Sequence, residues 1–387
     1  MIPIRKIYLA VLTLTLIGCT EIYVPDIETD KHILVVEGLV TDGEGPFHVK
    51  LTEALSYDSD SNARTKFIPN AKMTLLESEG SVFELTHIGF GVYSLPATFR
   101  AKVGHSYVLR IVTIDKNIYE SNPQTLLPPE TFDSIHTSIA VIKSKNEAFL
   151  QKIYCYDIRV DLFHAVSAAN PSPLCRFESN VVTHYDYQYS LEVDPKTDTF
   201  PSWGWSVHAW KTTPLDERTN LTEERAKSSN PCILDHFLCN IPYGLQNYGI
   251  YLIPEYANIT YYFRFNQYTL NEDTYQFYKQ ANSQLAASGK LFDPISSQLY
   301  GNMKCVTDST RIVLGLFEVS SVTKSAYVVS GLPTDKTINL RKVPYVNISP
   351  DEKYNKYKYS IFPDSTIDIS TDPEYIEIPL PGWWSHH

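Results

Sequence analysis

Residues 259–289 read ITYYFRFNQYTLNEDTYQFYKQANSQLAASG, and this stretch decides the expected fold. In its first part apolar side chains occupy every second position, which is typical of a strand with one buried face. These positions are Ile259, Tyr261, Phe263 and Phe265. In its second part Thr269 to Glu272 fits a capping box, apolar residues follow at helical spacing, and Gly289 is a stop signal. We therefore predict a strand followed by one main helix near residues 270–288.

Short strands are expected on the N-terminal side of this stretch, over residues 31–128. An apolar run at residues 33–37 ends at Gly38, and residues 47–51 alternate between apolar and polar. Two hairpins are expected around Glu79-Gly80-Ser81 and Asp115-Lys116-Asn117. Six or seven short strands within about 100 residues are typical of a small antiparallel sandwich of the immunoglobulin-like or transthyretin-like kind. Its expected buried residues include Val35, Val49, Leu75, Leu109 and Ile111.

A larger β-rich region is expected over residues 129–387, after a boundary at Pro128-Pro129. Apolar residues alternate again at residues 154–162, and tyrosines do so at residues 185–189. With 27 Tyr, 24 Pro and 16 Gly among 387 residues, the composition also favours strands and turns. The chain is therefore predicted to be mostly β, with one main helix, in two domains. The role of the tail at residues 333–387 is left open.

The net charge of the chain limits the kinds of molecule that it can be expected to bind. The formal net charge is −11, and hydrophobic residues make up 43% of the chain, as in an ordinary folded protein. A nucleic-acid-binding protein would need basic stripes on its surface. The sequence contains none, so no nucleic-acid partner is expected.

The first nineteen residues predict an export signal followed by a lipidation site. Arg5 and Lys6 precede eleven mostly apolar residues, and Gly18 precedes Cys19. Eleven residues are too few to span a bilayer, which takes about 20, so residues 1–18 are expected to be a cleaved signal peptide. Gly18-Cys19 matches a bacterial lipobox, which makes Cys19 the expected site of acylation, by palmitate or a similar chain. Residues 19–30 would then be a tether, and the protein would be anchored to a membrane without spanning it.

Three stretches resemble the Bacteroidota lipoproteins that are grouped as domain of unknown function 4249. The first covers residues 34–42 and 45–47, and the second covers residues 91–93 and 103–107. The third is the most specific and includes Gln267-Tyr268, Tyr275, residues 288–294, residues 301–305 and residues 313–317. The resemblance covers about residues 19–330. It implies an outer-membrane lipoprotein, typically encoded beside a TonB-dependent transporter with a carboxypeptidase-regulatory-like extension, and it implies no catalytic residue.

Five cysteines remain after Cys19, namely Cys155, Cys175, Cys232, Cys239 and Cys305. Export to an oxidising compartment favours disulfides, and the odd count leaves at least one thiol unpaired. We expect a local Cys232–Cys239 disulfide, while a longer-range pairing to Cys305 stays open. A zinc site at Cys232-x₃-His236-x₂-Cys239 is disfavoured, because structural zinc usually takes four ligands and only three strong ones are present. No metal or cofactor is expected.

Two further motifs suggest chemistry but lack a required residue. Residues 204–208, GWSVH, resemble a G-x-S-x-G nucleophile elbow around Ser206, except that His208 replaces the last glycine. Residues 58–62 begin like a calcium loop, but Ala63 and Pro69 stand where an EF-hand needs Gly and Glu. We therefore expect no catalytic residue here, and a polar loop rather than a calcium site.

Two groups of residues are candidates for surface roles. Residues 133–135, 308–310 and 364–366 resemble the O-glycosylation sites of the same phylum, which consist of Asp, then Ser or Thr, then an apolar residue, and the candidates are Ser134, Ser309 and Ser365. The candidates for contact with a ligand or a partner are Trp203, Trp205, Trp210, Trp383 and Trp384. Adjacent residues of a strand point to opposite faces, so the last two cannot both point inward.

Taken together, these features predict a non-enzymatic accessory protein of a TonB-dependent transport system. It would be lipid-anchored at the outer membrane, face the cell surface, and hold substrate or cover the outer mouth of the transporter. The alternatives are a surface hydrolase that acts on glycans or peptides and a structural or adhesive envelope protein. Two carboxylates within about 10 Å of each other in an aromatic cleft would favour the hydrolase.

Overall fold

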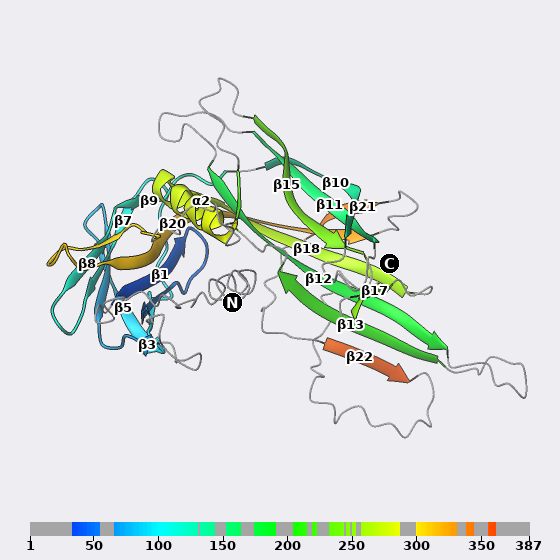
Figure 1. The fold of residues 1–387 in the computed structure, drawn as a ribbon, viewed down its shortest axis with the longest axis horizontal. Helices are drawn as coiled ribbons and strands as arrows, with labels where there is room; N and C mark the ends of the chain where they lie inside the picture. Colours follow the sequence, from blue (N-terminus) through cyan, green and yellow to red (C-terminus); the bar gives the residue numbers. More distant parts are fainter. Residues whose placement is uncertain are drawn as a thin grey trace, which may run out of the picture.

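A computed structural model of the chain describes residues 33–54, 66–130, 132–143, 152–163, 174–190, 204–214, 219–222, 232–243, 245–247, 250–252, 257–286, 299–330, 338–343 and 355–360. These residues are mostly β-strand, with one helix, α2 (Glu272–Ala286), as the sequence predicts (Figure 1). Among them, no helix combines the length and the apolar character that crossing a membrane requires.

The N-terminal part has two layers of strands. In the first layer β3 (Lys66–Phe67) and β6 (Val92–Ser94) pair with one edge of β2 (His48–Glu53), and β1 (Leu34–Thr41) and then the first half of β20 (Val313–Ser330) follow on its other edge. The second layer contains β4 (Lys72–Glu77), β5 (Val82–Gly89), β7 (Ser106–Val112), β8 (Ile118–Ser121), β9 (Gln124–Thr125) and β19 (Met303–Cys305). β5 pairs with β4 and also with β6, so the sheet curls from one layer into the other. The two predicted hairpins are confirmed as β4–β5 and β7–β8.

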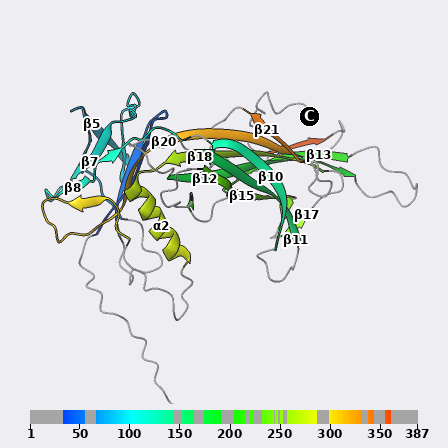
Figure 2. The same cartoon turned by 90° about the horizontal axis from the view of Figure 1, so that it is seen from above.

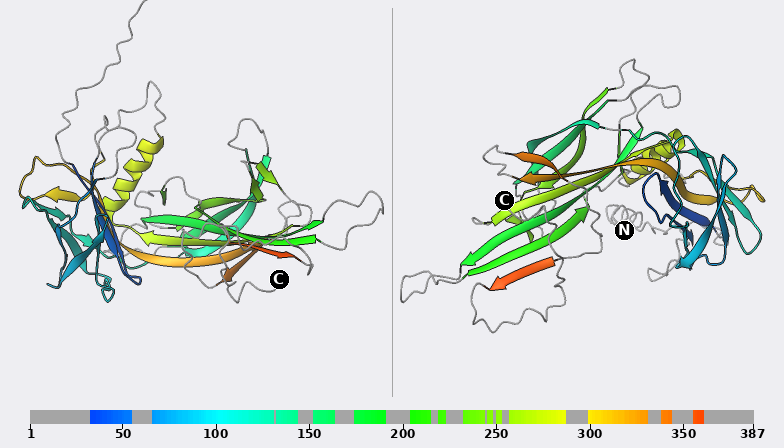
Figure 3. Two further views of the ribbon diagram at one scale, coloured as in Figure 1. Left: turned by 90° about the horizontal axis from the view of Figure 1, so that it is seen from below. Right: turned by 180° about the vertical axis from the view of Figure 1, so that it is seen from behind.

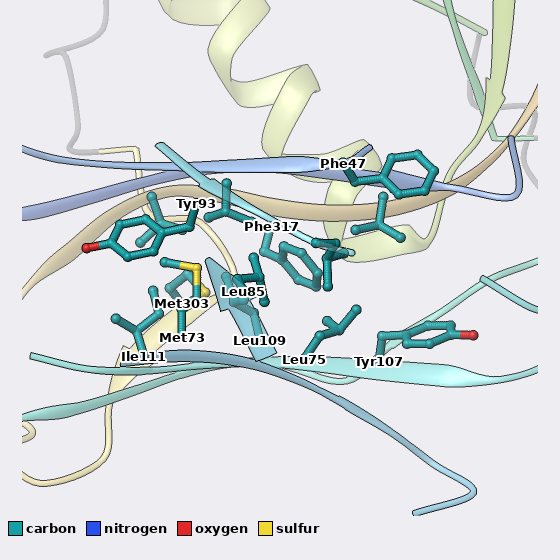
Figure 4. Close-up of a cluster of buried hydrophobic side chains, with 14 of the residues drawn as sticks. Phe47, Met73, Leu75, Leu85, Tyr93, Tyr107, Leu109, Ile111, Met303 and Phe317 are labelled. Carbon is teal, nitrogen blue, oxygen red and sulfur yellow. The ribbon is translucent and has the colours of Figure 1, made fainter. Parts of the chain in front are cut away.

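Apolar side chains from both layers fill the space between them (Figure 4). Alternate residues of β4 and β7 are fully buried, including Leu75 and Leu109. The predicted buried residues are confirmed except for Val35, because its neighbour Val36 points into the core instead. Residues 33–36 are all apolar, so the sequence period could not choose between the two faces of this strand. An immunoglobulin-like or transthyretin-like topology for this part stays a prediction.

The N-terminal core also takes residues from far along the chain, beyond the predicted boundary at residue 128. Met303 of β19 and Phe317 of β20 belong to the same core as Leu75. Asn302 holds this segment in place, because its side chain accepts a hydrogen bond from the N–H of Phe317 (3.0 Å) and donates one to the carbonyl oxygen of Phe317 (2.7 Å). Residues 31–128 are therefore only part of the N-terminal β structure.

The C-terminal part consists of a larger and a smaller sheet (Figures 2 and 3). The larger sheet runs in the order β22 (Asn355–Ser360), β13 (Gly204–Pro214), β12 (Cys175–Ser190), β18 (Ala257–Thr269), the second half of β20 and β21 (Asn339–Val343), with β14 (Asn220–Leu221) beside the start of β12. The smaller sheet contains β10 (Phe132–Lys143), β11 (Lys152–Phe163) and β15 (Cys232–Pro242). A short hairpin pairs β16 (Leu245–Asn247) with β17 (Ile250–Leu252).

An aromatic core lies between the two C-terminal sheets. Alternate residues of β18 are buried there, including Tyr261, Phe263 and Phe265, and they meet Tyr156 and its alternate neighbours from β11. The alternation predicted for both strands is therefore confirmed over these residues. Near the start of β11, Tyr154 departs from the pattern and is 39% exposed.

β20 belongs to both parts of the molecule. Residues Val313–Ser320 pair in parallel with β1, and residues 321–329 pair antiparallel with β18. Gly315 makes the first pairing possible. Its φ is +91°, and a Cβ at this position would lie 2.0 Å from the carbonyl oxygen of Val36. Only glycine combines this conformation with so close an approach.

The helix α2 follows β18 and folds back over the larger sheet. Tyr275 of α2 packs in a small cluster with Leu174, Tyr268 and Leu270. The predicted capping box is wrong in register, because the helix begins only at Glu272. Thr269 pairs with Ser321 in the sheet and accepts a hydrogen bond from the N–H of Glu130 (2.8 Å). The sheet therefore uses the residues that the pattern assigned to the cap.

Candidate functional site

A group of buried charged side chains lies under α2, where the two parts of the molecule meet. Arg176 is on β12 beside Tyr268 of β18, and Glu318 is on β20 at its junction between the two parts. Alternation along β12 puts Phe177 into the aromatic core and leaves Arg176 and Glu178 on the opposite face. We call Arg176, Glu178, Glu318, Tyr268 and Tyr278 the Arg176 cluster.

The Arg176 guanidinium group makes all of its described contacts within the cluster. Its Nε donates to both carboxylate oxygens of Glu318, at 3.1 and 3.3 Å, and its Nη1 donates to Glu178 Oε1 at 2.5 Å. The guanidinium carbon lies 3.8 Å from the ring centre of Tyr268 and 5.3 Å from that of Tyr278. A charged planar group is thus held by two anions and two aromatic faces, which is a strong arrangement for arginine.

The two tyrosines complete the hydrogen bonding of the carboxylates. Tyr278 donates to Glu318 Oε2 at 2.6 Å, and Tyr268 donates to Glu178 Oε2 at 3.0 Å. Burial and then the nearby carboxylates raise the pKa of both tyrosines, so their hydroxyls stay protonated as donors. Burial lowers the pKa of Arg176, but the charges of Glu318 and Glu178 more than offset this and raise it. The cluster is therefore a set of fixed charges.

Two carboxylates beside two tyrosines meet the distance part of the criterion for a glycoside hydrolase. Both lie within hydrogen-bond distance of one guanidinium group, so they are less than about 10 Å apart. Glu318, however, is only 2% exposed, whereas the side chain of Glu178 is 49% exposed. Only one of the two carboxylates can reach a substrate. The geometry therefore favours a structural clamp between β12, β18, β20 and α2 over a pair of catalytic acids.

A shallow groove runs along α2 beside this cluster. Its volume is about 530 Å³, and it lies between α2 and the segment around β14. Asn282 fixes this segment, since its amide accepts from the N–H of Thr219 (3.1 Å) and donates to the carbonyl of Thr219 (2.6 Å). The residues that line the groove are Leu221, Thr222, Tyr275, Lys279, Asn282, Ser283 and Ala286. They give it a mixed polar and apolar surface that is open to solvent.

A second charged group covers the outer face of the smaller sheet. His136 Nε2 lies 2.9 Å from Asp235 Oδ1, and Arg159 Nη1 donates to Asp235 Oδ2 at 3.1 Å. Ser134 donates to Asp161 Oδ2 at 2.6 Å. The pKa of Asp161 is lowered mainly by this bond, and that of Asp235 mainly by its bond to His136. Ser134 is paired with an aspartate rather than with the histidine, so the group lacks the serine–histidine contact of a nucleophilic relay.

The predicted Cys232–Cys239 disulfide needs correction. Both residues lie on β15, seven positions apart. At about 3.3 Å per residue their Cα atoms are on the order of 20 Å apart, whereas a disulfide needs less than about 7 Å. A Cys239–Cys305 bond is also excluded, because Cys239 lies in the aromatic core and Cys305 lies in the N-terminal core.

The other buried thiols are placed for packing rather than for reactivity. Cys155, Cys175 and Cys305 are buried and form no disulfide. Burial raises the pKa of Cys155 to about 11 and that of Cys175 to about 12. The reactive thiolate form is therefore scarce at neutral pH. Among the described residues, no group of three or more His, Cys, Asp or Glu side chains has the spacing of a metal site.

The remaining candidates fall into three sets. Ser309 is exposed in a turn that Asp308 stabilises by accepting from the N–H of Thr310 (3.0 Å), and Ser134 is exposed on β10. Trp205 and Trp210 lie on β13, where five residue steps put their backbones about 17 Å apart. Of Cys232, on β15, only the backbone is described. The candidates outside the described residues are Cys19, Trp203, Ser365, Trp383 and Trp384, and the loop at residues 58–62 lies outside them too.

The sequence analysis did not select the Arg176 cluster. One signal was available, because Glu318 interrupts an apolar run between Phe317 and Val319. A charge within such a run indicates a buried partner. Nothing in the sequence names that partner, since Arg176 is 142 positions away.

The fold and this cluster define a mostly β protein in which one long strand joins two β structures. The chain belongs to the family described as Domain of unknown function (DUF4249), whose model matches residues 20–326. No curated protein and no solved structure matches the chain. The family match extends from the predicted tether to β20, so it includes both parts of the molecule and the Arg176 cluster.

Proposed function

We propose that the protein is a lipoprotein of the outer membrane of Bacteroidota and a non-enzymatic accessory component of a TonB-dependent transport system. It would face the cell surface and either hold substrate or cover the outer mouth of the transporter. The observation that carries this proposal is the pattern of residues 1–18, two basic residues followed by an apolar run and Gly18, which directly precedes Cys19 in a chain of this family. The clearest built cluster of charges, around Arg176, has the geometry of a clamp rather than that of a reaction centre.

The geometry supports a component that is positioned as one rigid body. β20 continues without interruption from the N-terminal sheet into the larger C-terminal sheet. Beside this junction, Ser321 donates to the carbonyl of Leu127, and Thr323 donates to that of Glu130 at 3.0 Å. The N–H of Val322 donates to Asp42 at 2.8 Å. A lid or a substrate-holding arm needs such fixed geometry, so that anchoring one end sets the position of the other.

Co-purification from outer membranes in mild detergent tests the proposal. We expect a tagged chain to recover a TonB-dependent transporter, and we expect Cys19→Ser to abolish both the acyl mass on the mature protein and its membrane fractionation. Recovery of the acylated protein as a free monomer would contradict the partner. Unchanged membrane fractionation of the Cys19→Ser protein, with no acyl mass on the parent chain, would contradict the anchor.

A further inference from the structure

The hairpin tip between β5 and β6 presents apolar side chains to solvent. Phe90 is 80% exposed, Ile88 is 58% exposed, and Phe67 on the adjacent β3 is 38% exposed. The rings of Phe67 and Phe90 meet edge to face, with their centres 5.8 Å apart. We call these three residues the Phe90 tip. A group of protruding apolar side chains of this kind marks an interaction site more often than scattered single ones do.

The backbone holds these side chains outward at a conformational cost. Gly89, Phe90 and Gly91 have φ values of 114°, 48° and 70°. Phenylalanine rarely adopts a positive φ, because its Cβ crowds the backbone there. Ile88 lies at an irregularity in the β5–β6 pairing between His87 and Gly89, and such bulges redirect a side chain. Strain that is kept in order to expose apolar groups indicates a function for them.

The Phe90 tip lies at the end of the molecule where the chain enters from its N-terminal side. Val35, at the start of β1, pairs with Thr52, which pairs in turn with Phe67. Figure 1 shows β3 and the end of β5 at the lower margin of the N-terminal part, on the side away from α2. Cys19 precedes Ile33 by 14 residues, which span at most about 50 Å. An acyl group on Cys19 would therefore keep this end close to a membrane.

We propose that the Phe90 tip inserts into the lipid surface to which the chain is anchored, an inference that rests on the lipid anchor of the proposed function. A protruding cluster of two phenylalanines and one isoleucine fits the boundary between headgroups and acyl chains. The net charge of −11 disfavours attraction to anionic lipids, so the contact is apolar and insensitive to salt. Insertion would fix the orientation of the whole molecule, which a flexible tether alone cannot do.

The test places the protein on a membrane without relying on acylation. A hexahistidine tag replaces residues 1–19 of the full chain, and the protein is bound to phosphatidylcholine vesicles that contain a nickel-chelating lipid. Phe90→Trp reports on the tip. Val103→Trp is the matched control, because Val103 is 45% exposed and lies far from the tip. It is four residues before Tyr107, which pairs with Glu77 at the end of β4 that points away from the Phe90 tip. Brominated acyl chains quench only a tryptophan that reaches the hydrocarbon boundary, and the five native tryptophans are subtracted with the parent chain.

We expect the added emission of Phe90→Trp to fall at least about twofold on brominated vesicles, at low and high salt alike, and that of Val103→Trp to stay unchanged. Ile88→Ser, which keeps the tip backbone, should roughly halve the quenching of Phe90→Trp. Absence of quenching at Phe90, or equal quenching at both positions, overturns the proposal. The proposal is also overturned if the tip stays in water on vesicles and Phe90→Asn abolishes co-purification of an envelope protein. The tip would then be a binding site for a protein and not for lipid. Because the tag replaces the lipid anchor, this result does not depend on whether the chain is acylated in cells.

Discussion

A buried charge is stable only when its partner is buried with it, and Arg176 illustrates this at the scale of single residues. Arg176 and Glu318 are 4% and 2% exposed, and Tyr278 supplies the remaining hydrogen bond to Glu318. Removing either ion leaves the other without its counter-charge in a medium of low dielectric constant. The net contribution of such a pair to stability is small, because desolvation offsets most of the attraction.

Arg176→Met should therefore lower the free energy of unfolding by about 3–5 kcal/mol. The double variant Arg176→Met/Glu318→Leu should recover much of this loss, because no buried charge is then left unpaired and the carboxylate of Glu178, which loses Arg176, is 49% exposed to solvent. Arg110→Met is the matched control, since Arg110 and Glu120 form a pair at 3.3 Å whose side chains are 43% and 28% exposed, and pairs at the surface contribute about 0–1 kcal/mol. Urea unfolding of the four proteins gives the values. A double variant that is less stable than Arg176→Met would contradict this account.

Glu77 provides a pH-dependent contribution inside the N-terminal part. Its side chain is 2% exposed and accepts a hydrogen bond from Tyr107 at 3.2 Å. Burial raises the pKa of its carboxyl, but hydrogen bonds and positive charges together hold that pKa below the ordinary value of 4.5. These groups belong to Ser81, Tyr107, Lys102 and His105. Because the pKa is lower in the folded protein, the stabilisation is complete above the unfolded pKa and is lost as pH falls through the folded pKa.

Glu77→Gln should thus lower the melting temperature most at neutral pH, with a loss of about 1.5–3 kcal/mol for the charge-assisted bonds. The difference from the parent protein should shrink as the pH falls below about 4.5. Thermal unfolding between pH 3 and pH 7 measures this difference. Glu84→Gln is the control, because Glu84 is 69% exposed. A difference between Glu77→Gln and the parent that stays constant over this range would show that the charge of Glu77 is not involved.

At the scale of elements, β20 is the strand on which the arrangement of the molecule depends. Its first half needs glycine at position 315, because the strand passes against the backbone of Val36. Gly80 has nearly the same φ, +90°, but a Cβ there would meet nothing within 4 Å. The two positions therefore separate the cost of the conformation from the cost of the contact.

Gly80→Ala should cost roughly 1–2 kcal/mol, the strain of a left-handed alanine. Gly315→Ala should cost clearly more, or prevent folding, because the added methyl group collides with backbone that cannot rotate away. Chemical unfolding of both variants, with far-ultraviolet circular dichroism to check the strand content, makes the comparison. Equal losses in the two variants would mean that β1 and β20 are less closely packed than the structure shows.

Local patterns predicted individual elements well but could not predict their partners. The alternation around Phe263 and the turn at Gly80 depend on neighbours in the sequence, so both were readable from it. The pairing of β1 with β20 joins residues almost 280 positions apart, and no local period encodes it. The same holds for Arg176 and Glu318, whose contact exists only because β12, β18 and β20 are neighbours in one sheet. For the cysteines, expectation from the cellular compartment suggested a disulfide that the continuous strand β15 does not permit.

At the scale of the whole molecule, the two β structures are not independent units joined by a linker. The chain leaves the N-terminal part after β9, forms the smaller sheet and the strands β12, β13 and β18 of the larger sheet, and returns through β19 and β20 to complete the first core. The chain segment at Glu130, between β9 and β10, is bound to both β18 and β20 by hydrogen bonds. A structure closed in this way should respond as one body to force or ligand at either end.

The last prediction concerns a fragment of residues 33–128, which contains the N-terminal strands except β19 and β20. Without those strands the core loses Met303, Val313, Phe317 and Val319, all less than 9% exposed. At about 1.5–3 kcal/mol for each buried side chain, the loss is roughly 6–12 kcal/mol, as large as the whole stability of a typical domain. The fragment should therefore show no cooperative thermal unfolding by circular dichroism. The same fragment joined by a flexible linker to residues 299–320, which supply β19 and the first half of β20, should unfold cooperatively and independently of reductant. If residues 33–128 unfold cooperatively alone, the N-terminal sandwich is a separate domain after all, and β20 only packs against it.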